Sequence, residues 1–513
     1  MPFELTNINS WRGSWDKRLA IFVLPLIILV FYITAAGHFS YTPDDTYIYL
    51  QFAKNVIHGN GISFNAGEPV YGVTGMLWLF LISAGGSVGV NLLLAAKALD
   101  LFLASMALVV FFFLAFEIMR DAILSLFATL VFSMNVWYMR WAGTGMDTSL
   151  AVLLLLATVW FCLRNEYFLS VVFGALTFLV RPEAALLLPL ILIDVYMNSF
   201  QKKRALQFML SLALIWFALL LPWELYAYHT FGSILPLTML AKSGAVFDPK
   251  DAWATLIKIG KTLSLSDGVT GILLVFSVLF HLLRTKPDLP TAGEKAEGFY
   301  YFRQGFVPLG WTILLIQIYA ATSTNTVSRY LVMCSPFIII FAFTFFYRFV
   351  AGPLGNAIAY SAIVAITAIV LLQNQMVYTV LVKPGIEAFE EGMESSLIPM
   401  GKWFASNSPA DAVVFAPDIG AVGYYSDRRI CDASGLITPA MLRYVREGYS
   451  IDRIISEHLY RKVCHANYLI HRSRQLRELE HTPGLTALFS KVFVQADLTS
   501  PKPYFYTVYK VEE

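Results

Sequence analysis

The chain is organised around residues 41–77, which read YTPDDTYIYLQFAKNVIHGNGISFNAGEPVYGVTGML. Asp44 and Asp45 stand side by side directly after Pro43, a residue that suits the first turn of a helix. Negative charge is favoured at a helix N-terminus. Apolar residues then recur at helical spacing, at Ile48, Phe52, Val56 and Ile57. We therefore predict an amphipathic helix that carries two adjacent carboxylates at its start.

The composition around this segment is that of a polytopic membrane protein. The 513 residues are 57% hydrophobic and only 14% charged, with a mean hydropathy of +0.63, whereas soluble domains carry about 25% charged residues. The net charge of +2 argues against a nucleic-acid partner. We predict a mainly α-helical transmembrane bundle of about 11 spans. The predicted spans are 20–37, 93–117, 122–138, 148–163, 168–180, 184–199, 205–226, 269–283, 306–321, 330–347 and 357–378.

The basic residues between these runs predict the orientation. With the N-terminus in the cytoplasm, nearly every inner segment carries Lys or Arg, as the positive-inside rule requires. The first span follows basic residues without a cleavage pattern and is interpreted as a signal anchor. Residues 76–88 are apolar, but a span there would reverse the charge bias. We interpret them as an interfacial helix within an outer loop at 38–92. The predicted location is the inner (plasma) membrane, with multiple passes.

The composition changes near residue 381. Residues 1–380 are predicted to form the transmembrane domain and 381–513 an extracytoplasmic α/β domain. Cys431 and Cys464 both fall in the second domain, but their spacing leaves their pairing open. The predicted strands are 411–417, 428–434, 467–473, 491–497 and 504–512, and the predicted helices are 386–407 and 439–461.

Several carboxylates fall in the predicted outer loops. A solvated helix cap explains one of Asp44 and Asp45 more easily than both, and charge next to an aromatic-rich helix at a membrane surface favours a cavity. Asp147, in WAGTGMDTSL, either caps the next span or shares the site of the aspartate pair. Glu183 lies in the Arg-Pro-Glu turn, where an ion pair of Arg181 with Glu183 or Asp147 is an equal alternative.

Cations fall on the same predicted face. Arg329, in Ser-Arg-Tyr, stands where the positive-inside rule disfavours cations, which points to an anionic partner that matches a guanidinium fork. Lys242 either holds a phosphate as a point charge or is an ordinary surface lysine. Arg181, Lys242 and Arg329 are thus the candidate cations of this face, and Asp147, Glu183 and His58 are further candidate site residues.

This set of charges fits chemistry on a lipid-linked phosphate. Cations would bind the phosphate while one carboxylate removes a proton from an incoming hydroxyl group. The sequence contains no P-loop, Rossmann glycine motif, HExxH or Gly-x-Ser-x-Gly, which argues against ATP-driven transport and serine hydrolysis. The alternative function is a secondary transporter or flippase, which predicts charges near mid-span, broken helices and an internal repeat.

These motifs resemble those of the type C glycosyltransferases, membrane enzymes that use polyprenyl-phosphate sugars. The resemblance rests on the aspartate pair with HGNGISFNAGEPV, on GMDTSL, LVRPEAALL and FGSILPLTMLAK, and on VSRYLVMCSPF. It covers residues 1–350 and is greatest to the terminal β-arabinofuranosyltransferases of cell-wall biogenesis.

The resemblance implies an inverting transfer of a sugar from a polyprenyl-phosphate donor to a cell-envelope glycan or lipid, outside the membrane. It makes Asp44 or Asp45 the catalytic base and has the other help to hold the acceptor or a metal ion; the place of Asp44 at the helix cap favours it as the base. It also implies that Arg181, Lys242 and Arg329 contact the donor phosphate and that Asp147, Glu183 and His58 contact the donor or acceptor sugar. Asp147 stands where the family often has Glu, which shortens its reach. Some members bind a divalent cation (Mg²⁺, Mn²⁺ or Ca²⁺), and no ligand cluster in this sequence decides the point. The sugar, arabinofuranose among the candidates, is left open.

Overall fold

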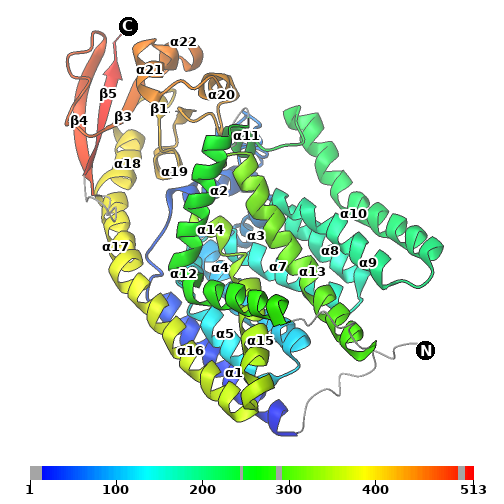
Figure 1. Cartoon of the computed structure of the whole chain (residues 1–513). Coiled ribbons are helices and arrows are strands. Elements are labelled where there is room, and N and C mark those ends of the chain that lie inside the picture. The colour runs from blue at the N-terminus through cyan, green and yellow to red at the C-terminus, as the bar shows by residue number, and fades with distance from the viewer. Residues whose placement is uncertain (1–13, 243–246, 285–291, 495–502, 513) are drawn as a thin grey trace.

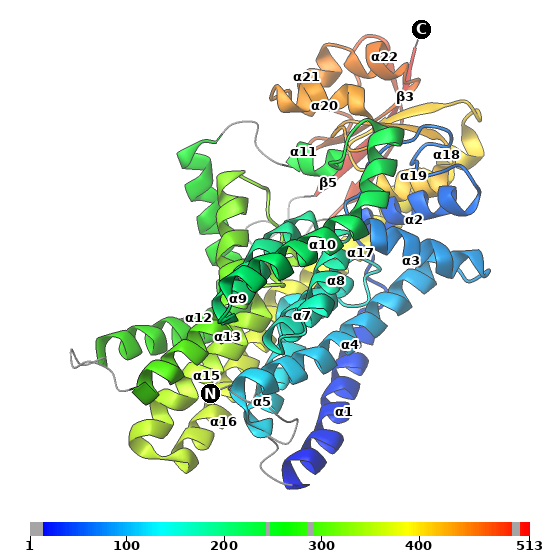
Figure 2. The same cartoon turned by 90° about the vertical axis from the view of Figure 1, so that its right-hand side faces the viewer.

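The computed structural model describes residues 14–242, 247–284, 292–494 and 503–512. A bundle of helices makes up most of the molecule, and a smaller α/β domain lies at one end of it (Figures 1 and 2). This confirms the predicted fold class. The α1–α15 helices of the bundle are α1 (Ser14–Ala36), α2 (Asp44–Ile57), α3 (Met76–Ser87), α4 (Leu92–Met119), α5 (Ala122–Ser133), α6 (Val136–Trp141), α7 (Thr148–Leu163), α8 (Tyr167–Phe178), the 3-10 turn η1 (Pro182–Leu186), α9 (Leu187–Asn198), α10 (Lys202–Phe231), α11 (Leu237–Lys242), α12 (Pro249–Arg284), α13 (Ala292–Ala321), α14 (Ser328–Leu331) and α15 (Ser335–Leu354).

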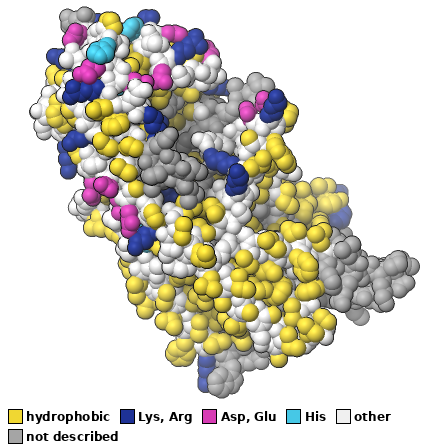
Figure 3. All heavy atoms as spheres, turned by 60° about the vertical axis from the view of Figure 1, so that its left-hand side comes forward, with side chains coloured by type: hydrophobic (Ala, Val, Ile, Leu, Met, Phe, Trp, Pro, Cys, Tyr) yellow, Lys and Arg dark blue, Asp and Glu magenta, His cyan; other side chains and the backbone are white. Residues whose placement is uncertain are grey.

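The membrane-spanning character of the bundle follows from the length and composition of its helices. Among the described residues, seven helices are long and apolar enough to cross a membrane, and four shorter apolar helices, α3 among them, accompany them. On the face drawn in Figure 3, hydrophobic side chains cover the lower part of the molecule, and charged side chains gather on the upper part. The chain is therefore a multi-pass membrane protein, and its number of spans stays a prediction.

Polar side chains fix where several of these helices begin. Asn91 and Asp121 cap α4 and α5 by accepting hydrogen bonds from backbone N–H groups three residues later. The predicted span at 122–138 is wrong in detail, because Asn135 separates α5 from α6. Its side-chain oxygen accepts hydrogen bonds from the amides of Trp137 and Tyr138, and so it starts a new helix.

A continuous helix joins the two parts of the molecule. It spans Asn356–Asn407 and is visible in Figure 1 as the long yellow rod. The predicted boundary at residues 380/381 falls inside this helix. Two single-turn π segments lie within it, and π turns, although rare, occur mostly as such single turns inside α-helices. Its parts are α16 (Asn356–Val377), η2 (Tyr378–Val382), α17 (Lys383–Gly392), η3 (Met393–Leu397) and α18 (Ile398–Asn407).

The C-terminal domain is built on a five-stranded sheet with the order β2-β1-β3-β5-β4. The first three strands pair in parallel, and β4 and β5 join them antiparallel. Four of the predicted strands are confirmed to within two residues at each end. The predicted strand at 491–497 overlaps β4 only at 491–493, and residues 495–497 lie outside the described residues. The predicted helix at 439–461 divides into three. The elements are β1 (Val413–Ala416), α19 (Gly420–Ser426), β2 (Arg429–Asp432), α20 (Pro439–Arg446), α21 (Ile451–Ser456), α22 (Leu459–Cys464), β3 (Tyr468–Ser473), β4 (Leu485–Phe493) and β5 (Tyr504–Val511).

Two contacts hold this domain together and place it on the bundle. A disulfide between Cys431 and Cys464 joins β2 to the end of α22 and answers the pairing that the sequence left open. The side-chain amide of Asn65 pairs with the backbone of Ile430, at 3.0 Å to its carbonyl and 2.9 Å from its amide. Asn65 thereby occupies the free edge of β2, so the segment between α2 and α3 shares an interface with the domain.

Candidate active site

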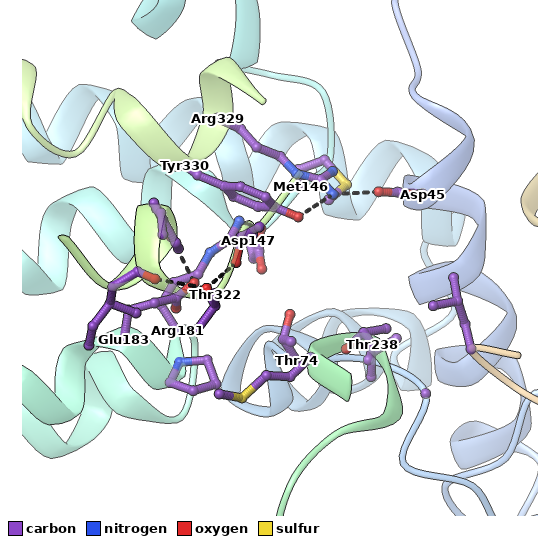
Figure 4. A pocket seen from close by; sticks show the side chains of 18 of the residues that line it. Asp45, Thr74, Met146, Asp147, Arg181, Glu183, Thr238, Thr322, Arg329 and Tyr330 are labelled. Atoms are coloured by element: carbon purple, nitrogen blue, oxygen red, sulfur yellow. Dashed lines mark hydrogen bonds and ion pairs between the residues drawn. The ribbon is translucent and has the colours of Figure 1, made fainter. Parts of the chain in front are cut away.

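A cavity of about 300 Å³ opens where α2, the Arg-Pro-Glu turn, α14 and the C-terminal domain meet. Most of its wall comes from the helical bundle, and Leu436 of the C-terminal domain completes it. Asp45, Asp147, Arg181, Glu183 and Arg329 all line it, although they are far apart in the sequence (Figure 4). The prediction that these charges share one site is therefore consistent with the structure.

Asp45 projects into the cavity from the first turn of α2. Its Oδ2 atom lies 2.5 Å from Nη2 of Arg329, which enters from the opposite wall (Figure 4). The Arg329 guanidinium is buried, and Asp45 is partly exposed. A carboxylate held this close to a guanidinium makes a strong charge-assisted hydrogen bond. Asp45 is thus paired with a buried cation and also reachable from the cavity.

Arg181 and Asp147 form a second, more deeply buried pair. Nη2 of Arg181 lies 2.7 Å from Oδ1 of Asp147, and both side chains are almost fully buried. The Tyr49 hydroxyl donates to the other Asp147 oxygen at 3.1 Å and accepts from the amide of Gly75. Both Asp147 oxygens are therefore in use. The alternative of an ion pair between Arg181 and Asp147, weighed from the sequence, is what the structure shows.

The two arginines converge on one aromatic ring. The guanidinium carbons of Arg181 and Arg329 lie 5.0 and 5.2 Å from the centre of the Tyr330 ring. Trp141 adds a second ring at 5.7 Å from Arg329. Cations are attracted to aromatic faces, and stacked guanidinium groups keep their N–H edges available. Two positive charges are thus held close together at the cavity wall.

Several polar atoms of the cavity have no partner within the described part of the chain. They are Nε of Arg181, Nε of Arg329, Oε2 of Glu183 and Oγ1 of Thr238, all shielded from solvent. The other oxygen of Glu183 accepts a hydrogen bond of 2.8 Å from the hydroxyl of Tyr319. Buried polar groups normally find a hydrogen-bond partner. Two donors on cations, one carboxylate acceptor and one hydroxyl group therefore lie unpaired beneath the cavity surface.

Asp44 points away from this cavity. Its Oδ2 accepts a hydrogen bond from the amide of Gly420 at 2.9 Å, and its Oδ1 accepts one from Ala421 at 2.8 Å. Burial, followed by repulsion from Asp418, raises the pKa of Asp44 to about 7 against the lowering effect of these amides. The sequence-based preference for Asp44 as the base does not fit this geometry, because its neighbour Asp45 faces the cavity.

Two other predicted residues do not contribute to the described cavity. His58 lies at the exposed C-terminal end of α2, where its Nδ1 contacts the backbone oxygen of Lys54. The proposed contact of His58 with sugar is not supported by this position. The side chain of Lys242 lies outside the described residues, although Thr238 and Met239 of the same helix line the cavity.

The sequence reasoning missed Tyr49 and Tyr319. Tyr49 follows Asp45 by four residues, which places both side chains on one face of α2, and this spacing was a usable signal. Tyr319 lies in an apolar run, and only folding brings it to Glu183. For a metal ion, the described residues contain no group of three or more His, Cys, Asp or Glu side chains placed to share one.

Two solved structures share this architecture. ArnT from Cupriavidus metallidurans, bound to undecaprenyl phosphate, matches with a TM-score of 0.58 over 96% of this chain and 98% of its own, at 12% identity. The oligosaccharyltransferase of Archaeoglobus fulgidus, in the apo form, matches with a TM-score of 0.56 over 90% of this chain and 70% of its own, also at 12% identity. This chain has the type C glycosyltransferase fold. The resemblance noted in the sequence is thereby confirmed at the level of the fold.

Sequence matches accompany the type C fold. The chain is 29% identical over 223 residues to the terminal β-(1→2)-arabinofuranosyltransferase of Mycobacterium tuberculosis. That match covers 39% of this chain and 35% of the relative, so it spans about a third of the relative's length. Residues 386–509 match the model of a domain of unknown function, DUF8728, which corresponds to the C-terminal domain described above.

Proposed function

We propose that this protein is an inverting glycosyltransferase that takes its sugar from a polyprenyl-phosphate donor. The observation that carries the proposal is the pair of Asp45 and Arg329 in one cavity, at 2.5 Å, with Arg181 beside them. A base and two cations are what transfer from a lipid-linked phosphate requires. ArnT, which has the same fold, is bound to undecaprenyl phosphate in its solved structure.

The proposed reaction is a single displacement at the anomeric carbon. Asp45 removes the proton from an acceptor hydroxyl group as its oxygen bonds to that carbon. The bond between the carbon and the phosphate oxygen breaks, and polyprenyl phosphate leaves with the electron pair. Arg329 and Arg181 stabilise the developing negative charge. The leaving group needs no proton, so one carboxylate suffices, unlike the two of glycoside hydrolysis.

The contacts of the cavity divide the remaining roles. Glu183, with a free buried oxygen, is proposed to accept a hydrogen bond from a sugar hydroxyl. Asp147, whose oxygens are both used, is proposed to hold Arg181 in place rather than to bind sugar. Donor phosphate would compete with Asp45 for Arg329. Binding of the donor would then release Asp45 to act as the base.

The proposal also covers the sugar, the acceptor and the orientation in the membrane. Arabinofuranose is the favoured sugar because of the partial match to the mycobacterial arabinofuranosyltransferase. The acceptor is proposed to be a glycan or lipid of the cell envelope. The distribution of Lys and Arg supports a cytoplasmic N-terminus and an extracytoplasmic C-terminal domain in the plasma membrane. The requirement for a divalent cation is left open.

One observation belongs to the alternative of a transporter. Asp267 is buried at a kink in the long apolar helix α12, the kind of feature that marks ion paths. By the predicted spans it lies at the end of an outer segment, next to the span that begins at residue 269. However, Asp267 accepts hydrogen bonds from Ser266 and Ser335, each at 2.6 Å, and from Asn135 at 3.3 Å. These contacts link α12 to neighbouring segments, so Asp267 has a structural role. Glycosyl transfer therefore remains the proposal.

The test uses purified full-length protein with synthetic polyprenyl-phosphate sugars (arabinose, mannose, galactosamine and glucose forms) and short envelope glycans as acceptors. We expect wild type to release polyprenyl phosphate and Asp45→Asn to be slower by about 10²–10⁴-fold, the usual contribution of a general base. Asp411→Asn is the matched control, because Asp411 is an exposed aspartate of the C-terminal domain that does not line the cavity. Wild-type rates in Asp45→Asn would refute the base, and no turnover of any donor would refute the function.

A further inference from the structure

We propose that Asp44 is a positioning residue that fastens α2 to the C-terminal domain and thereby holds Asp45 in the cavity. The inference rests on the proposed function and divides the aspartate pair into a positioning member and a reacting member. It also gives the C-terminal domain a role in catalysis, because the groups that hold Asp44 belong to that domain.

The contact between Asp44 and the C-terminal domain is specific. Each oxygen of the carboxylate accepts one backbone hydrogen bond, at 2.9 Å from Gly420 and 2.8 Å from Ala421. These amides begin α19 and have no intrahelical acceptor of their own. Gly420 is required at this point, because a Cβ atom there would lie 1.9 Å from the backbone oxygen of Asp44. The two segments therefore touch backbone to backbone.

This contact determines where Asp45 points. Successive residues of a helix are rotated by about 100° around its axis. When Asp44 is fixed against Gly420 and Ala421, α2 cannot roll, and Asp45 is turned toward Arg329, with which it pairs at 2.5 Å. A catalytic group must be held to within about 0.5 Å of its productive place. The bidentate contact of Asp44 supplies this constraint one residue away from the reacting carboxylate.

The surrounding interface supports the same arrangement. Lys54, further along α2, pairs with Asp427 at the end of α19. Figure 2 shows α2 and α19 next to each other at the junction of the bundle and the domain. Leu436 of the domain also lines the cavity. Docking of the C-terminal domain thus both completes the cavity wall and orients its carboxylate.

Two variants break the contact in different ways. Asp44→Ala removes both acceptors and leaves Asp45 unchanged, and Gly420→Ala keeps both carboxylates but forces the backbones apart. We expect each to lower the rate of sugar transfer at least tenfold. Asp44→Asn keeps one oxygen acceptor and should be intermediate. Gly385→Ala is the matched control, because a Cβ atom at Gly385 meets nothing within 4 Å.

Hydrogen–deuterium exchange and a double variant separate positioning from general damage. Exchange should rise in peptides covering 41–57 and 417–426 of Asp44→Ala and Gly420→Ala, and not in the Gly385→Ala control. Adding Asp44→Ala to Asp45→Asn should cause no further loss of rate, because the effect of Asp44 passes through Asp45. A further tenfold loss in the double variant would overturn the positioning role.

The outcomes also distinguish this inference from the proposed function. If wild type transfers sugar and Asp44→Ala and Gly420→Ala transfer it equally fast, the positioning role is wrong and the function stands. If no donor is used by wild type, the proposed function fails, and the exchange data still report on the contact. Unchanged exchange at 417–426 in Asp44→Ala would then overturn the contact as well.

Discussion

Oδ2 of Asp45 lies 2.5 Å from Nη2 of Arg329, a residue 284 positions further along the chain. In the proposed reaction these are the base and a cation that receives the leaving phosphate. Their pairing means that each of the two side chains neutralises the charge of the other. A donor phosphate that binds Arg329 must displace Asp45, which frees the carboxylate at the moment when an acceptor is needed.

Arg329→Lys should weaken donor binding although it preserves the charge. A lysine ammonium is a point charge without the planar fork that matches a phosphate, and it stacks less well on Tyr330 and Trp141. We expect the KM for the polyprenyl-phosphate sugar to rise about tenfold, which is about 1.4 kcal/mol. Arg429→Lys, at an exposed ion pair with Glu68, is the control and should leave KM unchanged. An unaltered KM in Arg329→Lys would contradict the phosphate contact.

Glu183→Gln should affect the sugar and spare the lipid phosphate. The free oxygen of Glu183 is proposed to accept from a sugar hydroxyl, and an amide group at that position can present a donor instead. Hydrogen bonds to charged groups contribute about 1.5–3 kcal/mol, so kcat/KM should fall by at least tenfold. Binding of sugar-free polyprenyl phosphate, measured by calorimetry, should not change. Equal losses for both ligands would place Glu183 at the phosphate instead.

Asp147→Asn should destabilise the protein. Asp147 and Arg181 form a buried pair at 2.7 Å, and removal of the carboxylate leaves the guanidinium charge uncompensated. Loss of one partner from a buried pair costs about 3–5 kcal/mol. Thermal unfolding in detergent measures the effect. Glu68→Gln breaks the exposed pair with Arg429 and should cost less than about 1 kcal/mol. Similar decreases in the unfolding temperature of the two variants would show that the buried pair contributes no more to stability than the exposed pair.

Docking of the C-terminal domain should weaken as the pH rises. Burial and Asp418 raise the pKa of Asp44 from the usual value to about 7, and Asp45 adds a smaller contribution of the same sign. A carboxyl group with a raised pKa stabilises the docked state fully below its ordinary pKa of about 4. That stabilisation is lost as the pH rises through about 7. Tyr47 also faces Asp44 and stays neutral in this range.

Hydrogen–deuterium exchange of 417–426 between pH 5 and 8, corrected for intrinsic rates, checks this sign. Wild type should lose protection toward pH 8, and Asp44→Asn, which has no ionisable group at this position, should show a flatter profile. Protection that increases with pH in wild type would contradict this prediction. It would show that the ionised carboxylate stabilises the contact, and that its hydrogen bonds outweigh burial and the repulsion from Asp418.

The sequence determined the features that depend on local pattern. Hydropathy predicted the membrane bundle, and alternation predicted the strands of the C-terminal domain. Pro43 and the apolar spacing predicted the helix that follows Asp44, and α2 occupies Asp44–Ile57. The unusual cation Arg329 and the Arg-Pro-Glu turn were found by their chemistry, because charges near a membrane are costly without partners.

Only the tertiary structure decided which charges meet. Asp44 and Asp45 are equivalent in sequence, and the docking of α19 alone assigns one to Gly420 and Ala421 and leaves the other to the cavity. Tyr319 reaches Glu183 only because an apolar helix passes behind the Arg-Pro-Glu turn. These partners come from segments far apart in the chain. Periodicity specifies the face of a helix, whereas the element opposite that face is chosen by packing of the whole chain.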